Sequence, residues 1–221
     1  MSYTLVYMTK LNVEYSLDFE VERVASTLKE IEWFKKNKYF LNLPEKFTDE
    51  IDVKKITKED IYTAIKSEFD EKVYEEAKEH ILSEWNDSMI DGDELAKLDV
   101  TPLNECRIFL TRYGVGGSYH FPNEIIINFQ QKYSFGRIRT IAHEITHLLI
   151  QTYISKYKVS HWRKERIVDL LMTKLSSKLY KEQNYRVDIK PVDDIFNAEY
   201  PKIEEIAKKV GELGEEVFLD K

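Results

Sequence analysis

The pattern of apolar residues divides the chain near residue 100. In the first part, residues 3–7 and 13–19 are rich in β-branched and aromatic side chains and predict a pair of strands. Residues 20–36 then carry apolar side chains at the spacing of one helix face. Thr57, followed by an acidic first turn, predicts the cap of a second helix that continues to about Trp85. This part is therefore expected to be mainly helical.

The second part mixes strands with helices. Residues 107–113 and 124–129 have the composition of strands, and the glycine-rich residues 114–122 between them predict a flexible hairpin connection. Segments with a helical period follow at residues 134–156, from about Ser160, and at residues 201–210. The sequence thus predicts an α+β fold in which a small mixed sheet packs on helices.

Length and composition favour one compact domain with an extension. We divide the 221 residues into a helical N-terminal region, 1–100, and a mixed region, 101–221, that ends in a helical segment. Hydrophobic residues make up 43% of the chain, which argues against wholesale disorder. The net charge is −7 and basic residues are scattered among acidic ones, so nucleic acid is not an expected partner.

Targeting signals are not visible in the sequence. The first ten residues lack a basic region followed by an apolar run, and no stretch approaches the ~20 apolar residues of a membrane helix. We therefore expect a cytoplasmic protein that does not act at a membrane. Cys106 is the single cysteine, so it has no partner for an internal disulfide and is expected to be a buried thiol.

Several residues with chemical potential are better explained structurally. Residues 91–94 combine acids with a glycine but lack the further oxygen ligands of a calcium loop, so a turn into a short helix is expected. His80 is expected at the surface or beside the core. His120, in the glycine-rich segment before the helix at 134–156, is expected as a rim residue and not as a zinc ligand. Trp33 and Phe34 are expected in the core.

The strongest chemical signal is the pentapeptide His143-Glu144-Ile145-Thr146-His147. On a helix, residues four apart project from the same face, so both imidazoles can reach one metal ion. Glu144 then lies beside the ion and can accept a proton from an activated water, which is the role of a general base. Such a pentapeptide would arise by chance in roughly one chain in a hundred of this composition, so its surroundings matter.

Glu165 can complete a three-ligand zinc site. At a rise of ~1.5 Å per residue, it comes level with His147 if the two predicted helices fold back on each other. Asp169 lies one turn further along the same face and can accept the ring N–H of a ligand histidine, His143 in our interpretation. Asp169 and His161 stay open as alternative third ligands.

Together these residues resemble the gluzincin clan of zinc metallopeptidases, whose best-known member is thermolysin. The resemblance covers about residues 105–180 and indicates a small, divergent member. It implies a zincin-like fold, in which the sheet packs on an active-site helix and a glutamate helix. It also implies one zinc ion, which His143, His147 and Glu165 would bind. In the same comparison, Glu144 would be the general base, and Asp169 would orient a ligand histidine.

The chain departs from the gluzincin pattern beside the ligand glutamate. Lys164 stands where many members carry asparagine, and Val168 where many carry a small residue. A metzincin is excluded, because Ile150 and Tyr153 stand where that group needs glycine and histidine.

The implied activity is hydrolysis of peptide bonds in a peptide or protein. An extended substrate is expected to pair with an exposed strand edge, for which residues 124–129 are our candidate. Gluzincins also tend to supply a tyrosine or histidine to the oxyanion, and the candidates are Tyr157, Tyr180, Tyr185 and Tyr200. The C-terminal stretch from Val187 either completes the wall of the cleft or lies across it. The alternative function is a zinc-stabilised binding or regulatory module without turnover.

Overall fold

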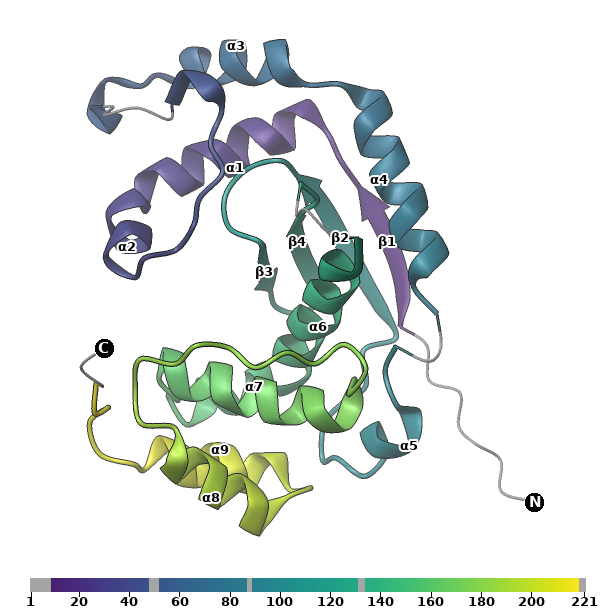
Figure 1. The fold of residues 1–221 in the computed structure, drawn as a ribbon, viewed down its shortest axis with the longest axis vertical. Helices are drawn as coiled ribbons and strands as arrows, with labels where there is room; N and C mark the ends of the chain where they lie inside the picture. The colour runs from purple at the N-terminus through teal and green to yellow at the C-terminus, as the bar shows by residue number, and fades with distance from the viewer. Residues whose placement is uncertain (1–8, 48–51, 87–88, 131–133, 219–221) are drawn as a thin grey trace.

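A computed structural model describes residues 9–47, 52–86, 89–130 and 134–218 (Figure 1). Its centre is a four-stranded sheet with the strand order β1-β2-β4-β3. Strands β1 (Lys10–Glu14), β2 (Glu105–Thr111) and β4 (Glu124–Asn128) run parallel, whereas β3 (Gly117–His120) is antiparallel to β4. This arrangement confirms an α+β fold with a small mixed sheet. Because β1 pairs with β2, the N-terminal region contributes a strand to the sheet of the mixed region.

One face of the sheet packs against helices α4 (Glu71–Glu84) and α6 (Ser134–Lys156). In α6, Ile138, Ile141 and Ile145 recur at helical spacing, and each is at most 1% exposed. Burial of each such side chain contributes roughly 1.5–3 kcal/mol. The strand residues that meet them alternate along β1, β2 and β4 and are all buried: Leu11, Val13, Cys106, Ile108, Leu110, Ile125 and Ile127. Hence α6 is held firmly along the sheet.

The N-terminal helices form a second, smaller core. Helices α1 (Leu17–Lys29) and α3 (Lys58–Glu68) pack through residues such as Val24 and Ile65, and the short helix α2 (Ile31–Lys36) follows α1. Two 3₁₀ turns, Glu45–Phe47 and Val53–Lys55, connect α2 to α3.

Two predictions for the first 36 residues were wrong in detail. The predicted strand over residues 13–19 ends at Glu14, because Ser16 caps α1 and accepts a hydrogen bond of 3.1 Å from the backbone of Phe19. The single helix predicted over residues 20–36 is divided at Glu30 into α1 and α2. Residues 3–7, predicted as the partner strand, lie outside the described residues.

The helix predicted from Thr57 to about Trp85 is also two helices. Thr57 caps α3 in a capping box with Asp60, as its sequence indicates. The chain then becomes extended at Phe69, and Asp70 caps α4 by accepting a hydrogen bond from the backbone of Lys72. The apolar period continues through this break, so hydrophobic pattern alone does not reveal it.

The glycine-rich segment between β2 and β4 is not a simple hairpin connection. It contains β3, which pairs with β4, so β2 and β4 are parallel neighbours within the sheet. Residues 124–129 are therefore not an edge, and the expectation that they receive a substrate is wrong. The exposed edge on this side of the sheet is β3.

Helices α7 (His161–Leu175), α8 (Lys190–Glu199) and α9 (Ile203–Gly211) follow α6. Helix α7 begins after Ser160, as predicted. Helix α9 corresponds to the predicted C-terminal helix, whereas α8 was not predicted. α7 packs against α6, α8 packs against α7, and α9 contacts both α8 and α6 (Figure 1). Asp91 caps the short helix α5 (Gly92–Leu95), which confirms the expected turn.

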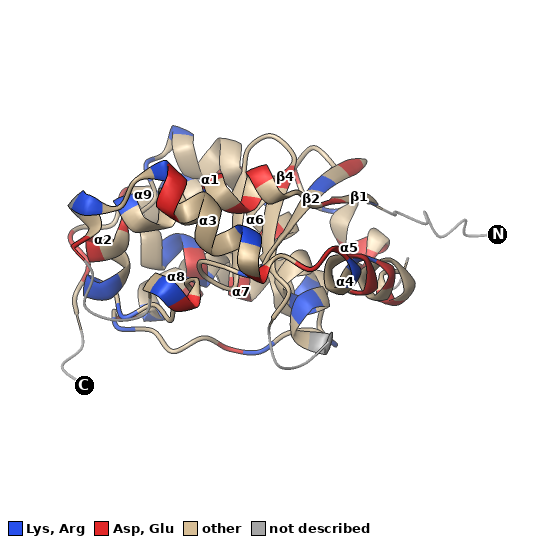
Figure 2. Ribbon diagram, turned by 90° about the horizontal axis from the view of Figure 1, so that it is seen from above, with Lys and Arg blue, Asp and Glu red and all other residues tan. Residues whose placement is uncertain are grey.

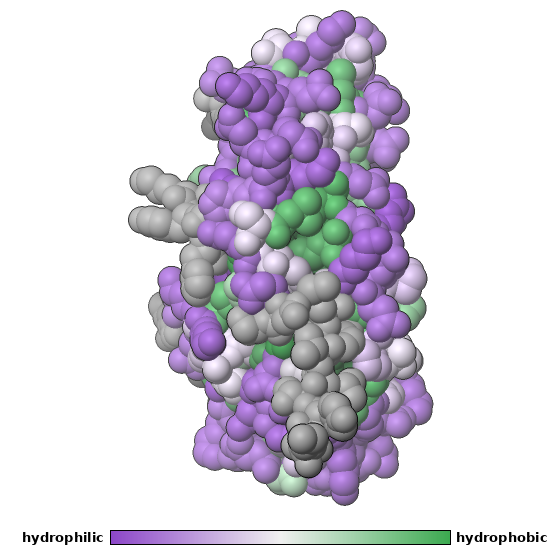
Figure 3. Space-filling view, turned by 90° about the vertical axis from the view of Figure 1, so that its right-hand side faces the viewer, coloured by the Kyte–Doolittle hydropathy of each residue, from purple (hydrophilic) through white to green (hydrophobic). Residues whose placement is uncertain are grey.

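Acidic and basic residues are mixed over the molecule, without separation by sign, and Figure 2 shows them interspersed along the helices. The face that Figure 3 shows is mostly hydrophilic, with one hydrophobic area near its middle. Among the described residues, none of the helices has both the length and the apolar character needed to cross a bilayer.

Candidate metal centre and cavity

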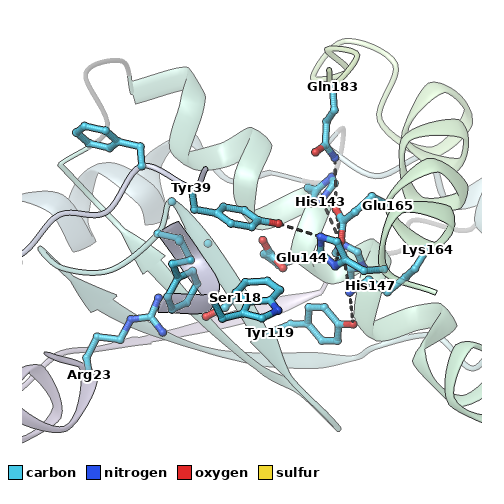
Figure 4. Close-up of a pocket in the computed structure, with 17 residues that line it drawn as sticks. Arg23, Tyr39, Ser118, Tyr119, His143, Glu144, His147, Lys164, Glu165 and Gln183 are labelled. Atoms are coloured by element: carbon cyan, nitrogen blue, oxygen red, sulfur yellow. Dashed lines mark hydrogen bonds and ion pairs between the residues drawn. The ribbon is translucent and has the colours of Figure 1, made fainter. Parts of the chain in front are cut away.

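α6 and α7 bring three potential metal ligands together (Figure 4). His143 Nε2 lies 3.1 Å from His147 Nε2 and 3.4 Å from Glu165 Oε2, and the remaining pair, His147 Nε2 and Glu165 Oε2, is also 3.4 Å apart. Within the described ranges, one group of three or more His, Cys, Asp or Glu side chains could hold a metal ion, and it consists of these three. We call them the metal group. The two helices thus place the histidine pair opposite a carboxylate.

The charges in this group depend on burial and on one another. Burial lowers the pKa of His147 to about 4, so its imidazole is neutral at ordinary pH. Burial also opposes ionisation of Glu165, but His147, His143 and Lys164 outweigh it and hold the pKa of Glu165 well below its usual range. A neutral imidazole and an ionised carboxylate are the protonation states that bind a metal.

Glu144 lies between this group and the sheet edge. It is 7% exposed, and burial raises its pKa to about 7. Gly117 at the start of β3 makes room for it, because a Cβ at Gly117 would press against Thr140 Cγ2 and lie 2.6 Å from Glu144 Oε1. The carboxylate is therefore held close to the backbone of the edge strand.

Asp169 and Gln183 lie next to the candidate ligands His143 and Glu165. Asp169 Oδ2 accepts hydrogen bonds from Tyr185 Oη at 2.6 Å and from the backbone of Gln183 at 3.1 Å. Its Oδ1 faces His143 Nδ1 at 3.9 Å, which is the predicted partner but beyond hydrogen-bond distance. Gln183 Nε2 also donates to Glu165 Oε2 at 3.4 Å and thus links both carboxylates.

Lys164 and Tyr119 form the side of the site near β3. Lys164 Nζ lies 3.3 Å from Glu165 Oε1 and donates to Tyr119 Oη at 3.2 Å. The ring of Tyr119 stacks on His147 with 4.7 Å between centroids. The lysine that departs from the gluzincin pattern therefore pairs with the carboxylate of the candidate ligand. His147 Nδ1 is buried and finds no hydrogen-bond partner among the described residues.

The N-terminal region supplies the opposite wall of a cavity of about 620 Å³ over the metal group. Tyr39 Oη and His161 Nε2 are hydrogen-bonded at 2.9 Å, although the two residues are 122 positions apart. Trp33 stacks on Tyr39 and is 45% exposed, so the expectation that it lies in the core is wrong. Phe34 also lines this cavity. Aromatic rings thus face the candidate ligands across an open space.

Two further cavity residues carry buried polar atoms. Nε and Nη2 of Arg23, and Oγ of Ser118, are buried and make no hydrogen bond within the part of the chain that the structure describes. Figure 4 shows both side chains on one side of the cavity, with His143, His147 and Glu165 on the other.

Other predicted residues lie elsewhere. His80 is exposed beside Glu84, and His120 is exposed at the end of β3. The four tyrosines proposed for the oxyanion, Tyr157, Tyr180, Tyr185 and Tyr200, do not line the cavity. The described residues after Gln183 do not line it either, so the C-terminal segment is not seen across the site. Cys106 is buried and unpaired, as expected.

Sequence reasoning missed the cavity residues that come from outside α6 and α7. Arg23, Tyr39 and Gln183 belong to no spaced motif, so the sequence offers no signal for them. No protein-family model, curated protein or solved structure matches the chain, and the candidate site therefore stands on its own geometry.

Proposed function

We propose that this protein is a zinc-dependent peptidase with a zincin-like site of the gluzincin type. The observation that carries the proposal is the spacing of the three candidate ligand atoms, 3.1, 3.4 and 3.4 Å. Two atoms bound about 2.0–2.1 Å from zinc at a tetrahedral angle lie about 3.3–3.4 Å apart. The side chains are therefore spaced for a tetrahedral ion with one open position.

The neighbouring side chains favour Glu165 as the third ligand. Asp169 directs both oxygens toward Gln183 and Tyr185. His161 Nε2 is occupied by Tyr39, and its Nδ1 lies 3.9 Å from Glu165 Oε1. Two histidines and a glutamate are also a known ligand set of catalytic zinc.

Glu144 is the proposed general base. A zinc ion bound here would polarise a peptide carbonyl and activate a water for attack. Glu144 follows ligand His143 directly and lines the same cavity, so its carboxylate can take the proton of the attacking water and pass it to the leaving amine. Its burial keeps this carboxylate out of competing contacts with bulk water.

Strand β3 is the proposed binding edge for an extended substrate. The backbone of Asn128 donates to Gly116 O, so by the alternation of an antiparallel ladder the N–H and C=O groups of Gly117 and Tyr119 point away from β4. A substrate strand can pair with these groups. Because Gly117 has no side chain, this pairing would bring the scissile bond close to Glu144.

Tyr39 is the proposed hydrogen-bond donor to the oxyanion. Burial raises the pKa of its hydroxyl to about 12, so the proton stays in place at ordinary pH. It lines the cavity together with His161, with which it shares a hydrogen bond. A donor of this kind contributes about 10²–10³-fold to the rate of acyl transfer.

A paired measurement of zinc content and peptide hydrolysis tests the proposal. Glu144→Gln keeps the shape of the side chain but removes its basicity, so we expect equal zinc and a loss of roughly 10²–10⁴-fold in hydrolysis. Glu79→Gln, an exposed change on α4, is the matched control and should keep full activity. If zinc-loaded wild type cleaves no member of a random peptide library, the protein is a silent zinc module and the proposal fails.

A further inference from the structure

The cavity contains polar groups that peptide hydrolysis does not use. Arg23 reaches it from α1 and Ser118 from β3, on the side away from the metal group (Figure 4). Arg23 Nε and Nη2 and Ser118 Oγ are buried without a hydrogen-bond partner among the described residues. A buried donor without an acceptor is destabilising, and native proteins rarely keep several of them in one place. Arg23 and Ser118 thus give the cavity wall a polar part whose donors the described chain does not satisfy.

Nearby acids do not satisfy Arg23. Burial lowers the pKa of Arg23, and the nearby charges of Glu20 and Glu144 oppose this. The carboxylate of Glu20, one turn earlier in α1, already accepts hydrogen bonds from Tyr74, Thr111 and the backbone of Arg112. Glu144 lines the same cavity but forms no ion pair with Arg23 in the described chain. The other cation of the cavity is Lys164, which is paired with Glu165 at 3.3 Å. Arg23 is thus the cavity cation, within the described chain, that no carboxylate contacts.

The unpaired atoms of Arg23 have the geometry of a carboxylate receptor. Nε–H and Nη2–H lie on the same edge of the guanidinium plane and can bind both oxygens of a carboxylate. Gly114 packs against this group, since a Cβ there would lie 2.7 Å from Nε and from Nη2. Any side chain at position 114 would collide with the guanidinium, so the glycine is what lets the main chain lie against Arg23 and hold it in place. Ser118 Oγ can add a third donor.

We propose that Arg23, assisted by Ser118, binds a carboxylate of the substrate. This carboxylate is either the C-terminal group of a peptide or the side chain of an acidic residue. The inference rests on the proposed peptidase function, to which it adds a substrate class. The aromatic residues Trp33, Phe34 and Phe40 line the same cavity and would contact the apolar part of the same substrate.

Matched peptides separate the two sources of carboxylate. One pair differs only in a C-terminal acid or amide, and a second pair differs only in glutamate or glutamine within the sequence. Hydrolysis is measured with the wild type. Binding is measured with the Glu144→Gln protein from the tryptophan fluorescence, to which Trp33 in the cavity lining contributes. The binding assay works without turnover, so it remains informative if the peptidase proposal fails.

We expect the acid form of one pair to bind and react about 10- to 100-fold better than its neutral partner. Arg23→Met should bring this ratio close to one, Arg23→Lys should leave part of it, and Ser118→Ala should lower it by a smaller factor. Arg137→Met is the matched control, because Arg137 also has a buried Nε without a partner but does not line the cavity. This control should keep the full ratio.

The inference is overturned if wild type treats both pairs alike, or if the Arg23 and Arg137 variants have the same effect. Absence of binding by every peptide also overturns it. Hydrolysis without discrimination would leave the peptidase standing and remove the carboxylate site. Binding that distinguishes acid from neutral peptides, without hydrolysis, would support the carboxylate site and contradict the peptidase proposal.

Discussion

Replacement of Asp169 by asparagine should weaken zinc binding without removing a ligand. Asp169 is 1% exposed, and its two oxygens face four donors or potential donors: Tyr185 Oη at 2.6 Å, the Gln183 backbone at 3.1 Å, Gln183 Nε2 at 3.3 Å and His143 Nδ1 at 3.9 Å. An asparagine must direct its NH₂ group at some of these donors in either orientation. The variant therefore loses a buried charge and its fixed orientation.

The magnitude follows from the role of such partners. Carboxylates that orient a metal-binding histidine change metal affinity by about 10–100-fold, which corresponds to about 1.4–2.7 kcal/mol. Each hydrogen bond to a charged group also contributes roughly 1.5–3 kcal/mol to stability. We expect Asp169→Asn to lower both zinc affinity and the free energy of unfolding of the apoprotein.

Competition with a chelator measures the zinc affinity, and chemical unfolding measures the stability. Tyr185→Phe is the control, because it removes one hydrogen bond to Asp169 but keeps the carboxylate charge. This variant should lower the free energy of unfolding by roughly 1.5–3 kcal/mol, the contribution of that one hydrogen bond, and change zinc affinity much less. If Asp169→Asn binds zinc as tightly as wild type, Asp169 does not support the metal group and this reasoning is refuted.

Three further predictions concern other parts of the chain. Gly117→Ala would place a Cβ 2.6 Å from Glu144 Oε1, so we expect hydrolysis to fall about 100-fold with zinc content unchanged, and a rate within twofold of wild type would contradict this. Hydrogen bonds from Thr57 lower the pKa of Asp60 to about 2, so its contribution to stability is present above its usual pKa and is lost as pH falls toward 2. Asp60→Asn should accordingly lower the unfolding midpoint at pH 7 but not near pH 2, and an equal loss at both would refute the assignment. Burial raises the pKa of Cys106 to about 12, so a thiol reagent at pH 8 should modify it only after unfolding, and rapid modification of the folded protein would contradict its burial.

The elements that carry the metal group could be predicted from sequence because their signals are local. The apolar period of α6 and the start of α7 after Ser160 agree with the structure. The spacing of His143 and His147 places them on one helix face, and helix rise brings Glu165 level with them. These arguments use only distances along helices, and the structure does bring the three side chains together.

The rest of the fold depends on competition that a periodic pattern does not record. At Phe69 and Asp70 the side-chain cap of α4 competes with continuation of α3, although the apolar spacing continues across the break. β3 is short and lies in a glycine-rich segment with little strand character. Its pairing with β4 is therefore determined by tertiary packing and not by local sequence preference.

The far wall of the cavity could not be predicted for a related reason. Tyr39 and Arg23 approach α7 and β3 only because β1 pairs with β2 and brings the following helices over the site. Contacts between residues more than a hundred positions apart leave no spacing in a single sequence. Most of the cavity residues that the sequence did not predict are therefore supplied by the N-terminal region.

The most direct test of the proposed metal centre is anomalous diffraction at the zinc edge from crystals of zinc-loaded protein. We expect one strong peak about 2.0–2.2 Å from Nε2 of His143, Nε2 of His147 and a carboxylate oxygen of Glu165. A peak on other residues, or none at this position under saturating zinc, would contradict the central claim.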